Sequence, residues 1–546
     1  MQIRIRIAHS VSNASSSPAS VREPRTLGAS SRVALGILVS RLTGLIRERV
    51  IGHYFGVDSI VADAFRAAIR IPNLLSNLFG EGVLSASFVT IYAKLRAREE
   101  DEEADHLAEA VFGILSLVCS VLVLCGVLLT PFLIDFIAPG FQGEKRDLTI
   151  RIVRILFPGT GLLVMSAWCL GVLNSHRRFL LSYMAPVALN LTVIAAFLLL
   201  GPRFFQDRLV VYIAWAFVLG AGLQFLVQLP RVRSLLPEFH PALDFRSEHV
   251  RSVLRNFGPI FLSRGVVQIS AYIDSIIASY LPLGAIAALG YGQVISVLPV
   301  SLFSMSVSAA ELPALSSALG SEDEVAAFLR ARLLSGLRRI AFFIIPSAAA
   351  FLLLGDVLAA GLYQSGKFHH GDAVYVWSVL AGSAVGLLAS SLGRLYSSAF
   401  YALLDTKTPL RFAVIRVLLT TALGIFCALY LPDWIGVDRR WGIAGLTASA
   451  GVAGWMEFAL LRHALGARIG KTGIPAVFAV KLWFAALTGG VAGYAVKLAL
   501  GVVHPVLLAV VVLSLYGFIY FGATALMDIP ESRATVSGVM RRAGIL

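Results

Sequence analysis

Runs of about 20 apolar residues recur along the whole 546-residue chain. Only α-helices and closed β-barrels can cross a bilayer, because every backbone polar group must be hydrogen-bonded inside the segment. A spanning helix needs about 20 residues and a spanning strand only about 10. Charged residues make up 14% of the chain, against about 25% in soluble domains. We therefore predict an all-α polytopic membrane protein.

The apolar runs fall into a group of six and a group of eight, which gives about 14 spans in two lobes. The first group covers residues 32–55, 59–92, 107–136, 148–174, 182–201 and 210–230. The second covers 252–280, 285–316, 329–354, 373–403, 410–431, 442–464, 475–500 and 504–527. We predict a disordered cytoplasmic tail (1–30), an N-lobe (31–231), an amphipathic connector (232–250), a C-lobe (251–528) and a cytoplasmic C-terminal tail (529–546).

Arginine and lysine gather in alternate loops, which predicts the orientation of the chain. Cytoplasmic loops carry an excess of these residues, and this bias places both termini in the cytoplasm. The even number of predicted spans agrees. The net charge of +14 then reflects these loops and an attraction to anionic headgroups rather than nucleic acid.

One stretch, residues 40–88, is unusually charged for a membrane segment. Its charged residues are Arg41, Arg47, Glu48, Arg49, Asp63, Arg66, Arg70 and Glu81. Such charges are costly in hydrocarbon and normally face a cavity or a partner. Helical spacing predicts that Asp63 pairs with Arg66 and leaves Arg70 free. Since the guanidinium group matches phosphate oxygens, the stretch predicts a polar cavity for an anionic headgroup.

Motifs of catalysis are missing from the chain, and we expect a transporter rather than an enzyme. There is no P-loop, GxSxG or HExxH pattern, and the four cysteines lie singly in apolar runs. Without a nucleotide site, an ion gradient, the membrane potential or the substrate gradient would drive transport.

Two further ionisable residues lie in the seventh span. Arg264 is a candidate second cationic contact, and Asp274 either binds a cation or neutralises a neighbouring arginine.

The charged stretch also strongly resembles the MurJ/MviN family of lipid II flippases. The resemblance rests on residues 40–56 (SRLTGLIRERVIGHYFG), 62–65 (ADAF), 70–75 (RIPNLL) and 79–88 (FGEGVLSASF). It continues through 138–141 (APGF), 312–315 (LPAL), 363–368 (YQSGKF) and 405–409 (DTKTP). Several motifs in the same order make this resemblance specific.

The resemblance implies a MATE-like fold with six spans in one lobe and eight in the other. It also implies movement of undecaprenyl-diphosphate-linked peptidoglycan precursor (lipid II) from the inner to the outer leaflet by alternating access. The implied partners are lipid II, membrane lipids and cell-wall synthesis proteins. Family positions are matched by Arg41, Arg47, Asp63, Arg70 and Glu81.

The chain departs from the family pattern in the C-lobe. A charged cluster expected in the eighth span is replaced by Gln293, Val294 and Val297. Arg264, one span earlier, is expected to compensate, and Arg264→Ala should then abolish function. Some relatives bind sodium near the position of Asp274. Here the later ligand positions hold Thr420 and Gly424, so a sodium ion at Asp274 is the one cofactor that we consider.

Two alternative functions stay open from the sequence. The altered C-lobe cluster is compatible with a paralogue that flips another polyprenyl-linked glycan or exports drugs by ion coupling. A non-transporting scaffold for cell-wall synthesis is the other alternative, and it would have a closed or apolar cavity. The arginines at positions 41, 47 and 70 argue against the scaffold.

Overall fold

The computed structural model describes residues 27–79, 84–236, 239–317, 321–501 and 503–542. These residues form helices and contain no β-strand. The first group of elements comprises α1 (Leu27–Phe55), α2 (Ile60–Phe79), the π-helical turn η1 (Ser85–Val89), α4 (Thr90–Ala97), α5 (Asp101–Ile137), α6 (Gly143–Ser175), α7 (Phe179–Leu200) and α8 (Gln206–Arg233).

The second group follows the connector. It comprises α9 (Glu248–Ser279), α10 (Ala285–Pro299), the π-helical turn η2 (Val300–Met305), α11 (Ser306–Ser316), α12 (Glu322–Tyr363), α13 (His370–Ala402), α14 (Lys407–Ile425), the π-helical turn η3 (Phe426–Tyr430), α15 (Leu431–Ile435), the 3-10 turn η4 (Arg439–Trp441), α16 (Gly442–Ile469), α17 (Ala476–Leu500), α18 (Pro505–Leu526) and α19 (Pro530–Arg542).

Eleven helical segments of the described chain are long and apolar enough to cross a membrane. They confirm the polytopic all-α class that the apolar runs predict. The other three predicted spans coincide with α1, with α2 to α4 and with α9, which carry charged residues along their length. The total of 14 spans therefore stays a prediction.

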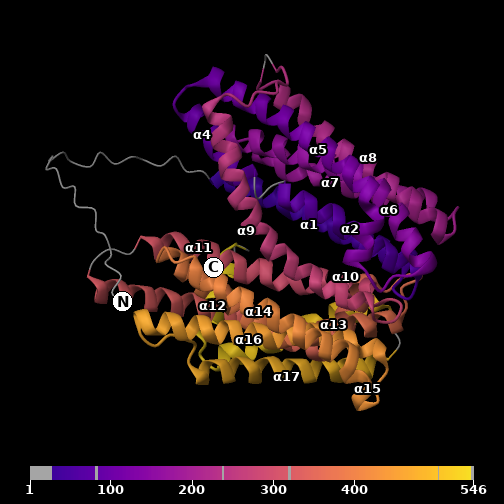
Figure 1. Ribbon diagram of the computed structural model, residues 1–546. Coiled ribbons are helices and arrows are strands. Elements are labelled where there is room, and N and C mark those ends of the chain that lie inside the picture. The colour runs from indigo at the N-terminus through magenta and orange to yellow at the C-terminus, as the bar shows by residue number, and fades with distance from the viewer. Residues whose placement is uncertain (1–26, 80–83, 237–238, 318–320, 502, 543–546) are drawn as a thin grey trace.

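The helices form two bundles, which we call the N-lobe (α1 to α8) and the C-lobe (α10 to α18), and α9 runs between them (Figure 1). In the N-lobe, α6 packs against α8 and α2, and α1 packs against α7. In the C-lobe, α13 packs against both α12 and α16. The bundles meet on the right of Figure 1 and diverge on the left.

Contacts between the lobes gather at one end of the molecule, which we call the sealed end. It consists of the loops 56–59, 138–142, 280–284 and 364–369. The Lys367 amide donates to the carbonyl of His53 at 2.8 Å, and the Gly140 amide donates to Ser279 Oγ at 3.1 Å. A Cβ atom at Gly140 would lie 2.2 Å from the Ser279 carbonyl oxygen, so this close approach requires glycine.

Two of the sequence motifs now have a physical role. The APGF motif (138–141) and the YQSGKF motif (363–368) both supply backbone to the sealed end. Gly366 has φ of +56°, a conformation that residues with a Cβ rarely adopt, and it lies against the carbonyl of His53. These motifs therefore hold the two lobes together at that end.

The connector between the lobes crosses the N-terminal part of α5. The described residues between α8 and α9, 234–236 and 239–247, form no helix. The connector backbone passes so close to α5 that a Cβ at Gly113 would lie 2.2 Å from the Ala242 carbonyl oxygen. At the other end of the chain, the predicted C-terminal tail includes helix α19, which is tied to α12 by an ion pair of 2.7 Å between Glu531 and Arg338.

The DTKTP motif (405–409) forms the turn into α14. The Asp405 carboxylate accepts hydrogen bonds from the amides of Lys407 and Thr408, each at 3.0 Å, and from Arg468 at 2.6 Å. Burial raises the pKa of Asp405, but the bonds from Thr408 and Arg468 outweigh that effect and lower the pKa to about 2. The ionised carboxylate thus fixes the start of α14.

Asp405→Asn keeps an oxygen acceptor but removes the charge that Arg468 binds, and it is expected to reduce stability by about 1 kcal/mol, the upper value for a partly exposed ion pair. The folded state lowers the pKa of Asp405, so this stabilisation is full above the unfolded pKa of about 3.9 and is lost as the pH falls toward 2. Thermal unfolding in detergent should show a gap between wild type and variant at pH 7 that narrows below about pH 4. A gap that is independent of pH would contradict this account.

Candidate functional site

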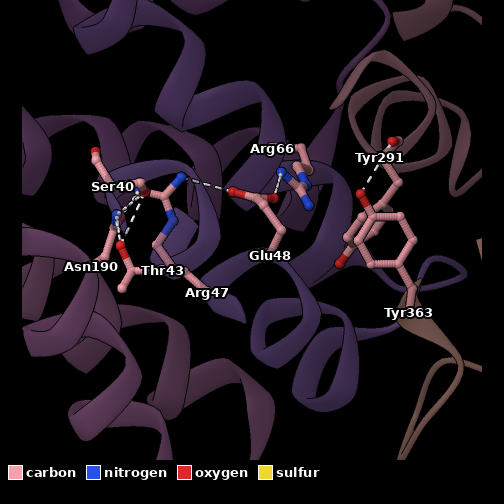
Figure 2. Close-up of polar contacts among 8 residues, drawn as sticks. All are labelled: Ser40, Thr43, Arg47, Glu48, Arg66, Asn190, Tyr291 and Tyr363. Carbon is pink, nitrogen blue, oxygen red and sulfur yellow. Dashed lines mark hydrogen bonds and ion pairs between the residues drawn. The ribbon is translucent and has the colours of Figure 1, made fainter. Parts of the chain in front are cut away.

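A row of polar and charged side chains runs from α7 through α1 and α2 to α10 (Figure 2). Glu48 on α1 lies between two arginines. Its Oε1 atom is 2.8 Å from Arg47 Nη2, and its Oε2 atom is 2.6 Å from Arg66 Nη1 on α2. Glu48 is only 6% exposed. The buried carboxylate is paired with a cation on each side, and the three groups together carry a net charge of +1.

Both arginines of this row have further partners. The Arg66 guanidinium lies 4.0 Å from the ring centre of Tyr291 on α10, a cation–π contact between the lobes. At the other end, Arg47 donates to Asn190 Oδ1 at 3.0 Å, and Asn190 donates to Thr43 Oγ1 at 3.1 Å. Figure 2 shows these groups in one row from Asn190 to Tyr291.

Arg47 faces the interior of the N-lobe rather than the space between the lobes. It lines a cavity of 210 Å³ among α2, α6, α7 and α8. Polar side chains share that lining with Arg47, namely Asn73, Thr160, Asn190 and Gln224. Arg47 is therefore separated from the other predicted substrate contacts by Glu48.

Asp63 takes part in the sealed end. Its carboxylate accepts the amide of Gly284 at 3.0 Å and the amide of Ala287 at 2.9 Å, so it caps α10 of the opposite lobe. Lys145 forms an ion pair with the same carboxylate at 2.5 Å. The predicted pair between Asp63 and Arg66 is therefore not formed. Asp63 caps α10 rather than pairing with Arg66, because the positive N-terminal end of a helix favours a carboxylate.

Arg41 and Arg70 differ from Arg47 and Arg66, which both bind Glu48. Arg41 donates to Ser301 Oγ at 2.9 Å, and Arg70 donates to Gln293 Oε1 at 3.0 Å. Both bonds cross from the N-lobe to the C-lobe and end on neutral groups. Among the described side chains, neither guanidinium lies within ion-pair distance of a carboxylate. These two arginines therefore keep the positive charge that an anionic ligand would need.

Ser301 belongs to the π-helical turn η2, which follows Pro299 directly. A proline removes one backbone hydrogen bond of its helix, and π-helical turns are frequent at functional sites. Helix α10 thus ends at Pro299, next to the point where Arg41 contacts the C-lobe. Gln293, which replaces a charged residue of the family pattern, is the group that Arg70 contacts.

Arg41, Arg70 and Arg264 lie at similar depths. With a rise of 1.5 Å per residue, Arg70 is about 16 Å and Arg41 about 22 Å from the loop at the sealed end. Position 264 of α9 is about 24 Å from the same end. The side chain of Arg264 lies outside the described residues, as does the whole of Glu81. Their predicted roles stay predictions.

Asp274 on α9 lies near two arginines of other helices, Arg70 and Arg416, and among the described side chains it is within ion-pair distance of neither. On α14, position 424 is a glycine and offers no side-chain ligand. The described residues contain no group of three or more carboxylate, histidine or cysteine side chains that could hold a metal. The two roles predicted for Asp274, binding of a cation and neutralisation of an arginine, stay predictions.

Sequence reasoning missed two partners in this region. Glu48 binds both Arg47 and Arg66, which the sequence pattern does not predict. Lys145 neutralises Asp63. A signal for the second pair was present, because Lys145 lies four residues after the APGF motif and Asp63 belongs to another motif. No local pattern relates Glu48 to Arg66 on the next helix.

Comparison with known proteins gives consistent results. Residues 51–515 match the sequence model of the family described as "Lipid II flippase MurJ". The chain is 33% identical to "Lipid II flippase MurJ" of Burkholderia cenocepacia over 433 residues, which is 78% of this chain and 80% of that protein. It is also 33% identical to "Probable lipid II flippase MurJ" of Rhizobium tropici over 77% of each chain.

Solved structures share the fold. The chain superposes on "Lipid II flippase MurJ, inward closed conformation" with a TM-score of 0.74 and 23% identity, over 91% of this chain and 98% of that one. An inward-facing multidrug transporter of the MATE family gives a TM-score of 0.61 and 20% identity, over 80% of this chain and 98% of that one. At these identities the structures support the fold alone, whereas the sequence matches show that the chain belongs to the lipid II flippase MurJ family.

Proposed function

We propose that this protein moves lipid II from the inner to the outer leaflet of the cytoplasmic membrane by alternating access. The observation that carries the proposal is the pair Arg41 and Arg70. They reach across the lobe interface and hydrogen-bond only to neutral groups among the described side chains. A diphosphate would supply the missing negative charge, and arginine binds phosphate oxygens through two parallel donors.

The chemistry of the substrate fits a site between two lobes. A diphosphate linked to a glycopeptide cannot cross about 30 Å of hydrocarbon unaided. Its prenyl tail is apolar and can stay in the lipid while the headgroup moves past the arginines. The proposed roles are therefore phosphate binding for Arg41 and Arg70, with Arg264 joining them from α9.

The sealed end supports an alternating mechanism. With the predicted orientation, the loops of the sealed end face the outside of the cell, so the headgroup would enter from the cytoplasmic side. Breaking the sealed-end contacts and forming new ones at the opposite end would then release the headgroup outward. Two lobes that rock about a central site are a common design among transporters.

Complementation tests the proposed function. The gene is expressed in a bacterium depleted of its own lipid II flippase, and the fraction of lipid II accessible from the outside is measured in the same cells. Growth and outward accessibility are both expected to recover. If the protein inserts into the membrane and neither recovers, another polyprenyl-linked glycan or a drug is the better substrate assignment.

A double variant gives this experiment its matched control. Arg41→Gln combined with Arg70→Gln should abolish the recovery, because both guanidinium groups proposed to bind the diphosphate are then removed. Arg439→Gln removes one arginine that is already paired with Asp433 at 2.7 Å on an exposed turn. This control should complement like wild type.

A further inference from the structure

A second cationic site lies on the outer surface of the N-lobe, away from the lobe interface. A groove of 440 Å³ runs between α6 and α8, and its lining includes Arg151, Arg154 and Trp215. These two helices lie on the side of the N-lobe that faces away from the C-lobe in Figure 1. The groove shares no residue with the site of Arg41 and Arg70, so this inference does not depend on the proposed function.

The two arginines lie on the exposed face of α6. Positions 147, 151, 154 and 158 are exposed and follow helical spacing, whereas the residues between them are mostly buried. Neither Arg151 nor Arg154 has an ion pair or a side-chain hydrogen bond with a described residue. Two neighbouring unpaired guanidinium groups on a membrane helix are costly unless an anion compensates them.

The carboxylate in the groove does not supply this compensation. Asp147 lies one turn nearer the start of α6 than Arg151, and its side chain is 78% exposed. Its nearest cation is Arg146, at 3.8 Å. Arg146 in turn binds Asp135 on α5 through two hydrogen bonds of 2.6 and 2.9 Å. The acidic residue thus points to water, and the two arginines remain unpaired deeper along the helix.

The depth of the groove matches the headgroup region of a bilayer. Helix α6 has 33 residues and is about 50 Å long, while the hydrocarbon core is about 30 Å thick. About 10 Å of helix therefore lies outside the hydrocarbon at each end. Arg151 is about 12 Å and Arg154 about 16 Å from the start of α6. Both guanidinium groups can reach the lipid phosphates at the boundary.

The facing helix has the residues of a membrane interface. Arg208, Tyr212 and Trp215 lie on one exposed face of α8, and Trp215 is 54% exposed. Tyrosine and tryptophan are enriched at the level of lipid headgroups. Trp215 is about 13 Å from the start of α8, a depth similar to that of Arg151. The groove therefore combines an aromatic wall with two unpaired cations.

We propose that this groove binds the phosphate of an anionic membrane phospholipid, with Arg151 and Arg154 as the phosphate ligands and Trp215 against the glycerol and upper acyl chain. The charge of the groove selects an anionic headgroup over a zwitterionic one, because a headgroup amine would meet two guanidinium groups. The bound lipid would remain attached to the N-lobe at the end that includes residues 138–142.

Fluorescence quenching of Trp215 tests the proposal on the full-length purified protein. Phosphatidylglycerol with bromine on its acyl chain is added to the protein in phosphatidylcholine nanodiscs. The groove signal is the difference in quenching between wild type and Trp215→Phe. Half-maximal quenching should require about tenfold less brominated phosphatidylglycerol than brominated phosphatidylcholine.

Charge variants decide the outcome. Arg151→Gln combined with Arg154→Gln retains Trp215 and should raise the half-maximal concentration of phosphatidylglycerol about tenfold. Arg231→Gln combined with Arg233→Gln removes equal charge from the opposite end of α8 and should change nothing. Equal quenching by the two lipids, or unchanged quenching in the first double variant, would overturn the proposal. So would displacement of the lipid by millimolar inorganic phosphate, which would indicate a site for a free anion.

Discussion

An Arg70→Gln variant is expected to insert normally and to lose outward transport of lipid II by at least about a hundredfold. Among the described arginines of α2, only Arg70 donates a hydrogen bond to a neutral side chain of the opposite lobe. Truncating one partner of a desolvated charge pair costs about 2–5 kcal/mol, and each 1.4 kcal/mol is a factor of ten. The glutamine can still hydrogen-bond to Gln293, so the fold should remain intact.

Arg70→Lys separates charge from geometry. Lysine keeps the positive charge but lacks the planar donors that bind two phosphate oxygens at once. We expect transport intermediate between wild type and Arg70→Gln, measured as lipid II accessible from the outer leaflet per unit of inserted protein. Wild-type transport by Arg70→Gln would show that the diphosphate does not depend on this residue, and the proposed site would be wrong.

Asp63→Asn is expected to open the sealed end. The change leaves Lys145 without its counter-ion and replaces the carboxylate that caps α10. The two amide hydrogen bonds to the Asp63 carboxylate cross between the lobes. A hydrogen bond to a charged group contributes about 1.5–3 kcal/mol, which corresponds to a tenfold or larger shift between two states. The lobes should therefore spend much more time separated at the loops that Asp63 now joins.

Accessibility of residue 57 measures this opening. Val57 is fully buried at the sealed end, so Val57→Cys should react slowly with a membrane-impermeant maleimide added outside the cell. Adding Asp63→Asn should increase the labelling rate at least about tenfold. Asp58→Asn is the matched control, because it breaks the partly exposed pair with Arg440 at the same end. Surface pairs contribute at most about 1 kcal/mol, and labelling that rises equally in both variants would refute the role of Asp63.

The sequence predicts the helices well because hydrocarbon imposes a minimum length on apolar runs. It predicts their ends less well. The span predicted at 329–354 is part of α12, which runs from Glu322 to Tyr363. The additional turns of α12 are polar or pack against α13, whereas hydropathy identifies only the part of a helix that lies in lipid. Likewise, α5 begins at Asp101, six residues before the predicted apolar run.

The site was predictable in composition but not in pairing. Charge in an apolar stretch pointed to α1 and α2, from which Arg41, Arg66 and Arg70 contact the C-lobe. Helical spacing then suggested Asp63 with Arg66, a pair within one helix, whereas the structure joins Arg66 to Glu48 and Asp63 to Lys145. Those partners lie on other helices, and their proximity depends on packing that one sequence does not display.

The sealed end has a consequence for the role of water in the cycle. Its contacts include backbone groups, among them the amides of Gly284, Ala287 and Lys367 and the carbonyls of Gly361 and Leu362 that accept from Arg49. Buried backbone groups do not remain without a partner, so each must be hydrated when the lobes part. Opening this end is therefore a hydration reaction. Osmolytes that are excluded from protein surface should hold the transporter shut, and the cycle should slow as the activity of water falls.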